Sequence, residues 1–130
     1  MKVKGFKGEF AQINTSTISY GLKSEANCRS KIQYVCGQAL KECFKFDPIL
    51  EEVPIPGIGL YLDFFIPSRK LAFEIRGRQH DEYVPYFHKS PKGFKASKDR
   101  DDIKARWCDL NNITLYQITS PEEIKELYGN

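Results

Sequence analysis

The feature that most constrains this fold is a pair of apolar runs separated by a short break. Residues 59–66 and 71–75 are rich in aliphatic and aromatic side chains, and the sequence Pro-Ser-Arg-Lys at 67–70 separates them. Two such runs with a short polar break are typical of a β-hairpin whose strands are both largely buried. We therefore expect the fold to be organised around this hairpin.

Each expected strand of the hairpin contains one acid, Asp63 or Glu74. Their spacing places one acid late in the first strand and the other late in the second, across a short turn. Because a buried carboxylate is costly unless it is paired or binds a metal, two at facing places indicate a cation site. Oxygen ligands suit Mg²⁺ or Mn²⁺ rather than zinc. Arg76, Arg78 or backbone N–H groups are alternative partners, and the spacing alone leaves both interpretations open.

Length and composition favour one globular domain, residues 1–130. No apolar run is long enough to span a membrane, and no apolar segment follows the N-terminal lysines as in a signal peptide, so we expect a cytoplasmic protein with no membrane partner. The four cysteines lack the paired spacing of a zinc site and are interpreted as small core residues in a reducing compartment. The net charge is only +3, but Lys and Arg outnumber acids in residues 76–106.

The whole pattern predicts an α/β protein with a small mixed β-sheet flanked by helices, in the order α-β-β-β-α-β-α. Residues 24–44 carry apolar side chains at helical spacing, with Ser24 as the N-cap and Glu25 in the first turn, where the helix dipole alone explains its charge. The other expected elements are an edge strand at 49–53, a helix at 97–111, a strand at 113–118 and a short final helix that ends at Gly129.

Residues 79–96 show no regular period. They mix aromatic residues with lysines and also contain two prolines and one glycine. Such a loop suits the binding of a nucleic-acid strand, because rings stack on bases while ammonium groups contact phosphates. The alternative is a solvated loop whose aromatic residues fill the core. Residues 1–20 are expected to form an N-terminal arm, either one that grips DNA or an ordinary frayed terminus. The candidate nucleic-acid-binding residues are Arg78, Tyr83, His88, Lys89, Lys92, Lys95 and Lys98.

The groups expected to converge are those needed to hydrolyse a phosphodiester. Asp63 and Glu74 on the hairpin would lie near His80, which follows the second strand, and near Glu25 or Asp101 at helix starts. A divalent ion on a carboxylate pair polarises a phosphate, and histidine moves a proton near neutral pH.

These positions resemble the PD-(D/E)xK nuclease superfamily. Asp63-x10-Glu74-x-Arg76 is similar to its core motif, with Arg where Lys is usual. The neighbourhood resembles the very-short-patch-repair-like branch, the EDxHD endonucleases: Glu25 matches the first acid, Asp63 the strand Asp, and His80 the histidine. Arg100-Asp101 matches the Arg-Asp before the last core strand, and Glu74 falls on the variable position. The resemblance covers about residues 24–118 and implies a restriction-endonuclease-like core.

The resemblance also implies roles for these residues. Asp63, Glu74 and the Ile75 carbonyl would bind Mg²⁺, for which Mn²⁺ would substitute. His80 would transfer a proton or contact phosphate, oriented by Asp101, with Asp99 and Asp102 as competitors for that role. Glu25 would act through a metal-bound water. Arg76 stays protonated and cannot serve as a base, so it can only bind phosphate or transition-state charge.

The expected function is a Mg²⁺-dependent DNA endonuclease, a nickase or an enzyme of the homing, mobile-element, repair or recombination type. Its partner would be DNA, most simply double-stranded, with a homodimer or targeting partner to supply specificity. One alternative is a nucleic-acid-binding module that keeps the fold without cleaving, which Arg76 in place of Lys favours. Another is an interaction protein whose acids are only paired with Arg76 and Arg78.

Overall fold

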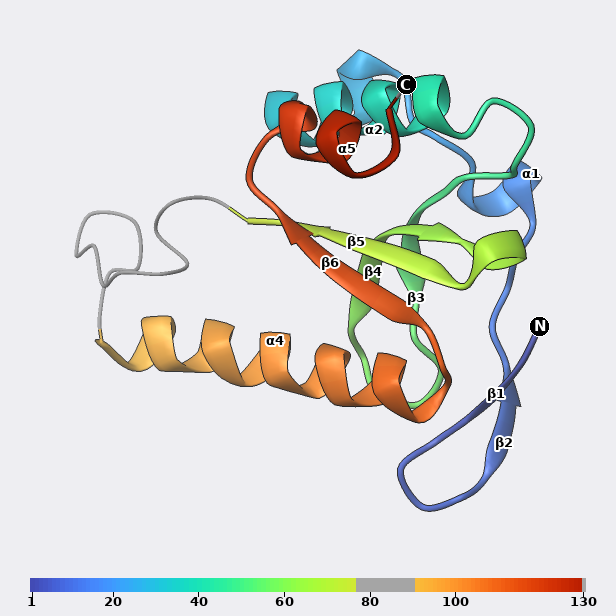
Figure 1. The fold of residues 1–130 in the computed structure, drawn as a ribbon. Coiled ribbons are helices and arrows are strands. Elements are labelled where there is room, and N and C mark those ends of the chain that lie inside the picture. The colour runs from blue at the N-terminus through green and yellow to red at the C-terminus, as the bar shows by residue number, and fades with distance from the viewer. Residues whose placement is uncertain (77–90, 130) are drawn as a thin grey trace.

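A four-stranded mixed β-sheet lies at the centre of the protein. The computed structural model describes residues 1–76 and 91–129 (Figure 1). The strands are β3 (Leu50–Pro54), β4 (Tyr61–Ile66), β5 (Leu71–Ile75) and β6 (Thr114–Ile118). They lie in the order β3-β4-β5-β6; the first three pair antiparallel, and β5 and β6 pair parallel. The predicted edge position of the first of these strands is correct.

Helices cover both faces of the sheet (Figure 1). Two of them pack on one face, where Leu40 and Ile124 join Phe64 and Phe73 in one buried cluster. The third connects β5 to β6 across the other face, where Trp107 packs in a second cluster. The helices are α2 (Lys31–Cys43) and α5 (Pro121–Tyr128) on the first face and α4 (Pro91–Leu110) on the second. The predicted small mixed sheet flanked by helices is thus confirmed.

A single 3₁₀ turn, η2 (Pro67–Arg69), joins β4 to β5. Proline suits the start of such a turn because its φ is already fixed near the helical value. Lys70 then adopts a left-handed conformation with φ of 51°, and its N–H donates to the Pro67 carbonyl at 3.1 Å. Both strands that this turn connects are almost entirely buried, so the hairpin expected from the sequence is the structural centre of the sheet.

The side chains of β4 change faces at Asp63. Leu62 and Phe65 are three residues apart and yet both belong to the cluster under α4. In a regular strand, residues three apart point to opposite faces. Glu52, which lies opposite Asp63 in the register of β3 and β4, has a positive φ of 51°. The two strands are therefore distorted together at this point, and the distortion takes Asp63 out of the regular pattern.

The N-terminal residues fold onto the face of the sheet that α4 covers. A two-stranded antiparallel ribbon is followed by a short helix, and Val3 and Ile13 are buried in the cluster that contains Trp107. The elements are β1 (Lys2–Lys4), β2 (Phe10–Gln12) and α1 (Thr17–Tyr20). Residues 1–20 are thus a docked ribbon and not a frayed terminus.

Two predicted helices begin at other residues than expected. A 3₁₀ turn, η1 (Glu25–Asn27), is separated from α2, whose N-cap is Ser30; its side chain accepts from the Gln33 N–H at 3.2 Å. Ser24 makes no capping hydrogen bond. The apolar spacing extended the predicted helix too far because Cys28 lies in extended backbone and its thiol contacts a strand. The helix predicted at 97–111 begins at Pro91, so residues 91–96 are helical and not part of a loop.

Candidate functional site

Asp63 and Glu74 face each other where the ladder between β4 and β5 ends. The last paired residues of this ladder are Phe64 and Phe73. Beyond them, the Asp63 N–H donates to Glu74 Oε2 at 2.7 Å, and the Ile75 N–H donates to Asp63 Oδ2 at 2.9 Å. Each carboxylate thus replaces a ladder bond, and the two residues are only 4% and 6% exposed.

This placement corrects one expectation. Asp63 lies early in β4, whereas the sequence analysis placed it late in its strand. The correction follows from antiparallel geometry: the end of β5 lies beside the beginning of β4, so two acids late in both strands would lie at opposite ends of the hairpin. The two acids do face each other, as predicted, because one is early and the other is late.

Two cationic side chains contact the remaining oxygens of the pair. Arg29 Nη2 donates to Asp63 Oδ1 at 3.2 Å, and Lys104 Nζ donates to Glu74 Oε1 at 2.6 Å. Arg29 comes from the extended segment before α2 and its side chain is 60% exposed, whereas Lys104 comes from α4 and is 14% exposed. The Lys104 contact is therefore the better shielded from solvent and salt, and the Arg29 contact is weak by comparison.

The acid pair opens into a cavity of about 260 Å³. Its walls come from the segment before α2, from β4, from the end of β5 and from α4. Basic side chains outnumber acidic ones in this lining. The described lining residues are Arg29, Asp63, Glu74, Ile75, Arg76, Arg100, Asp101 and Lys104. The acidic side chains of this cavity are suited to a bound cation, and the basic side chains are suited to an anionic ligand that binds together with that cation.

The environment of the pair shifts the pKa of Glu74. Burial raises the pKa of Glu74 from its ordinary 4.5 to about 7, and the charge of Asp63 adds to that rise. Lys104 and the Asp63 N–H oppose the rise, because both stabilise the charged form. A pair of carboxylates with one strongly shifted pKa is common where a site binds a cation or handles protons.

The donor set fits a hard divalent cation. Asp63 and Glu74 each use one oxygen for a backbone N–H and present the other to a cationic side chain. An ionised carboxylate has about four acceptor positions, so further coordination capacity remains on both. Mg²⁺ is commonly held by one or two carboxylates, with water and substrate phosphate as its other ligands. In the part of the chain that the structure describes, no three His, Cys, Asp or Glu side chains converge as a metal cluster.

The structure brings together five of the predicted site residues. Asp63, Glu74, Ile75, Arg76 and Asp101 all line the cavity.

Glu25 and the remaining predicted residues are placed differently. The Glu25 side chain is exposed in η1 and is not among the described residues of the cavity wall. The helix that was expected to carry it begins only at Lys31, which explains its position. Lys92, Lys95 and Lys98 belong to α4. Arg78, His80, Tyr83, His88 and Lys89 lie outside the described residues.

Sequence reasoning missed the two direct partners of the acids. Lys104 follows Arg100 and Asp101 by one helical turn, so its spacing alone places all three on one face of α4. That signal was present in the sequence. Arg29 carried no comparable signal, because it was assigned to a continuous helix and its position depends on the break between η1 and α2.

Glu51 is a further buried acid of the sheet, and its partners differ in kind. Its oxygens accept from the Lys23 N–H at 2.9 Å and from Gln33 Nε2 at 2.8 Å, and the Cys28 thiol lies 3.4 Å away. The side chain is 1% exposed. Burial, and then the charge of Glu51, raise the pKa of the Cys28 thiol to about 11. This cluster ties the segment before α2 to β3.

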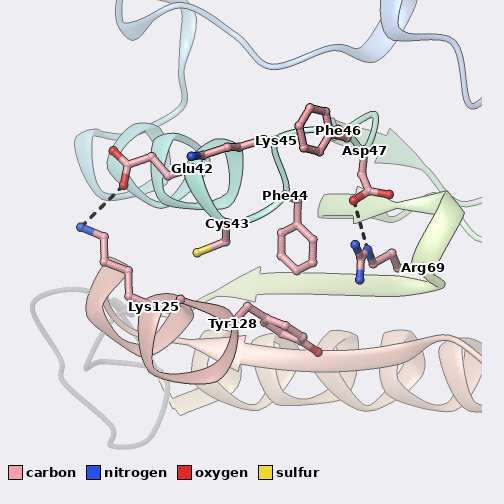
Figure 2. Close-up of a pocket in the computed structure, with 10 residues that line it drawn as sticks. Glu42, Cys43, Phe44, Lys45, Phe46, Asp47, Arg69, Lys125 and Tyr128 are labelled. Carbon is pink, nitrogen blue, oxygen red and sulfur yellow. Dashed lines mark hydrogen bonds and ion pairs between the residues drawn. The ribbon is translucent and has the colours of Figure 1, made fainter.

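A larger cavity, of about 620 Å³, lies where α2 ends, beside α5 and η2 (Figure 2). Its acids are Glu42 and Asp47, each with a cationic partner: Lys125 at 3.9 Å and Arg69 at 3.1 Å. The Glu42 and Lys125 side chains are both more than half exposed, and ion pairs of that kind contribute about 0–1 kcal/mol. The smaller cavity is distinguished by two buried, facing acids, one of which has a strongly raised pKa, and we take it as the candidate site.

The described helices include none that is both long and apolar enough to cross a lipid bilayer. All four cysteines are free thiols. Cys36 and Cys108 are buried in the core as predicted, whereas Cys28 and Cys43 are only partly buried.

Three viral proteins are similar to this chain. Uncharacterized protein 307L of Invertebrate iridescent virus 6 is 37% identical over 69 residues, which are 53% of this chain and 34% of that protein. Uncharacterized protein 094L of Frog virus 3 (isolate Goorha) is 32% identical over 108 residues, 82% of this chain and 66% of that protein. Uncharacterized protein 033L of Invertebrate iridescent virus 3 is 31% identical over 74 residues, 57% of this chain and 38% of that protein. The chain thus spans from about a third to just under two thirds of the length of these curated relatives. No family model and no solved structure matches it.

Proposed function

We propose that this chain is a divalent-metal-dependent DNA endonuclease with a restriction-endonuclease-like core of the PD-(D/E)xK kind. The observation that carries the proposal is the buried, facing pair Asp63 and Glu74, which lines a cavity that also contains four basic side chains. The same proposal gives Mg²⁺ as the cofactor and DNA as the partner.

The order of elements around the site supports the fold part of the proposal. The acids lie on adjacent antiparallel strands, and α4 and the parallel strand β6 follow. Asp101 reaches the same cavity from α4. These are the positions that the motif resemblance requires for its strand acids and its helix Asp.

The side chains of the cavity divide into two roles. Asp63 and Glu74 would hold the divalent cation, which when bound supplies Lewis-acid stabilisation of charge on a phosphate. Arg76 and Arg100 would bind the phosphate, since guanidinium groups stay charged and match phosphate geometry. Lys104 favours the ionised form of Glu74, against the burial that raises its pKa. Proton transfer falls to His80 in this proposal, because Arg76 cannot act as a base.

The contacts of Arg29 and Lys104 favour a second candidate function. Both acids already have a cationic partner from the protein, at 3.2 Å and 2.6 Å. A chain in which these contacts are permanent would bind nucleic acid without cleaving it. Its affinity would depend on salt but not on Mg²⁺.

Nicking of supercoiled plasmid separates the two candidates. The purified full chain should convert supercoiled to open-circular DNA in Mg²⁺ but not in EDTA. Asp63→Asn, which preserves the side-chain shape, should lower the rate by about a thousandfold or more, since it removes one of two charged ligands. Lys125→Ala, at an exposed ion pair outside the lining of the acidic cavity, is the matched control and should cut normally. Equal nicking by wild type and Asp63→Asn would refute the endonuclease, and DNA binding that is indifferent to Mg²⁺ and without nicking would identify the binding module.

A further inference from the structure

The outward face of the β1–β2 ribbon is basic and carries an exposed aromatic ring. The register pairs Lys2 with Gln12 and Lys4 with Phe10, so these four side chains share one face. The opposite face carries Val3, which is 3% exposed. The proximity of the ammonium groups to the Phe10 ring agrees with this arrangement: Lys2 Nζ lies 4.1 Å and Lys4 Nζ 5.9 Å from its centroid.

The fold itself does not account for this face. Phe10 is 59% exposed, and Phe6, in the loop of the ribbon, is 52% exposed, although rings of this size are usually among the main contributors to a core. Lysines alone would be explained by solubility, since they protect an exposed strand edge from pairing with another chain. Lysines that flank an exposed ring form a surface suited to DNA, because ammonium groups contact phosphates and an apolar ring can contact base edges in a groove.

The ribbon is anchored by hydrogen bonds and by a buried side chain. The Asn111 side chain, at the end of α4, bonds both backbone groups of Lys4: its Oδ1 accepts from the N–H at 2.7 Å, and its Nδ2 donates to the carbonyl at 3.0 Å. The Ile13 N–H donates to the Met1 carbonyl at 2.9 Å, and the Ile13 side chain is buried. A surface fixed in this way loses little conformational entropy when it binds a partner.

The ribbon is also continuous with the helix that carries the candidate site. The Arg106 guanidinium, on α4, lies 6.0 Å from the centroid of the Phe6 ring. Arg100, in the wall of the acidic cavity, is on the same helix. Six residues of α-helix span about 9 Å, so a duplex that crosses the cavity has the length to reach the ribbon. Figure 1 shows the ribbon beside the C-terminal end of α4.

We propose that the Lys2, Lys4, Phe10 and Gln12 face of the ribbon is a docking surface for duplex DNA. This inference rests on the proposed function for the identity of the partner. Lys2 and Lys4 contact phosphates, while Phe10 and Gln12 point into the major groove. This groove is wide enough to admit a two-stranded β-ribbon. The ribbon therefore supplies affinity and orientation, and the acidic cavity lies farther along the same helix.

The test is the salt dependence of binding to a fluorescently labelled 20-base-pair duplex, measured by anisotropy in EDTA so that no cleavage occurs. Removing two phosphate contacts should lower the slope of log K against log salt by about two and weaken binding at least tenfold. The double variant Lys2→Ala/Lys4→Ala should show this loss, and Lys2→Arg/Lys4→Arg should retain the wild-type slope. Lys31→Ala/Lys41→Ala, at exposed lysines on α2, is the matched control and should bind as wild type. Phe10→Ala should weaken binding several-fold.

The outcomes distinguish this inference from the proposed function. Wild-type affinity and slope in the Lys2→Ala/Lys4→Ala variant would overturn the docking surface even if the protein nicks plasmid. Loss of binding in that variant, with no nicking by wild type, would support the docking surface and refute the endonuclease. No binding of wild type to duplex would overturn both. A preference for single-stranded over duplex probe that depends on Lys2 and Lys4 would overturn the groove geometry.

Discussion

The sheet holds two sets of buried acids that are stabilised in different ways. The Glu51 carboxylate on β3 accepts its hydrogen bonds from neutral donors: a backbone N–H, an amide and a thiol. Asp63 and Glu74 also accept backbone N–H groups, but each of them contacts a cationic side chain and they lie beside each other. Only the latter pair lines the 260 Å³ cavity among the described residues.

The difference shows that burial of an acid does not by itself identify a functional site. Neutral donors that surround a carboxylate satisfy it and fix one conformation, which is a structural role. At the candidate site, burial and the charge of Asp63 raise the pKa of Glu74, and a cation that reaches the pair would stabilise its charged form. The candidate site is therefore defined by the juxtaposition of charges and by access to solvent.

The same substitution at two buried glutamates should give opposite phenotypes, and this is the largest effect we expect. Glu74→Gln should reduce nicking by about a thousandfold or more while DNA binding is kept or improved, because a charge that repels phosphate is removed. Glu51→Gln should instead lower the free energy of unfolding by about 1–3 kcal/mol, since an amide nitrogen would then face the donors of Gln33 and Lys23. Its nicking rate per folded molecule should stay normal. Nicking kinetics and urea denaturation of both variants check this, and equal loss of activity in both would remove the distinction.

Lys104→Met tests whether a protein cation keeps the pair competent. The variant retains most of the apolar stem but leaves Glu74 without its close partner, so the pKa of Glu74 should rise further. We expect nicking at pH 7 to fall about 10- to 100-fold and to recover partly at higher pH, where Glu74 is ionised again. The matched control is Lys125→Met, whose partner Glu42 is 3.9 Å away and exposed. A Lys104→Met variant with wild-type activity across the pH range would show that Lys104 has no part in the site.

The raised pKa of Glu74 makes a prediction about stability in metal-free buffer. The folded protein holds this proton up to about pH 7, whereas the unfolded chain releases it near the ordinary value of 4.5. Between these values the folded state binds more protons, so the free energy of unfolding should fall as the pH rises, by on the order of 3 kcal/mol from this group. Chemical denaturation in EDTA between pH 4.5 and 8 measures this. Glu74→Gln should remove this fall, whereas Glu51→Gln should retain it; a fall of the same size in Glu74→Gln would assign it to another group.

The smallest effect tests at which residue α2 begins. This helix contains Gln33, whose side chain bonds Glu51. Ser30→Ala should cost about 1 kcal/mol of stability, because the serine oxygen accepts from the Gln33 N–H at the start of α2. Ser24→Ala should cost only a few tenths of that, since Ser24 caps no helix. Thermal denaturation of the two variants compares them, and the reverse order would support the continuous helix from residue 24.

The hairpin and the facing acids could be predicted because their signals are local. The alternation of apolar runs around Pro67 and the spacing of Asp63 and Glu74 do not depend on the rest of the fold. The beginning of α2 was predicted too early because the apolar spacing continues back to Cys28, although Ser30, with Gln33 three residues later, is a local capping signal. The position of Arg29 depends on the break between η1 and α2 and was missed for the same reason. Lys104 could have been found from its helical spacing to Arg100.

The most direct test of the acid pair is a crystal structure of the protein grown with Mn²⁺, with data collected at the manganese absorption edge. We predict one anomalous peak coordinated by Asp63 Oδ1 and Glu74 Oε1, with the Lys104 ammonium displaced from Glu74. An absence of anomalous density at this pair, with Arg29 and Lys104 still in contact with the acids, would contradict the account.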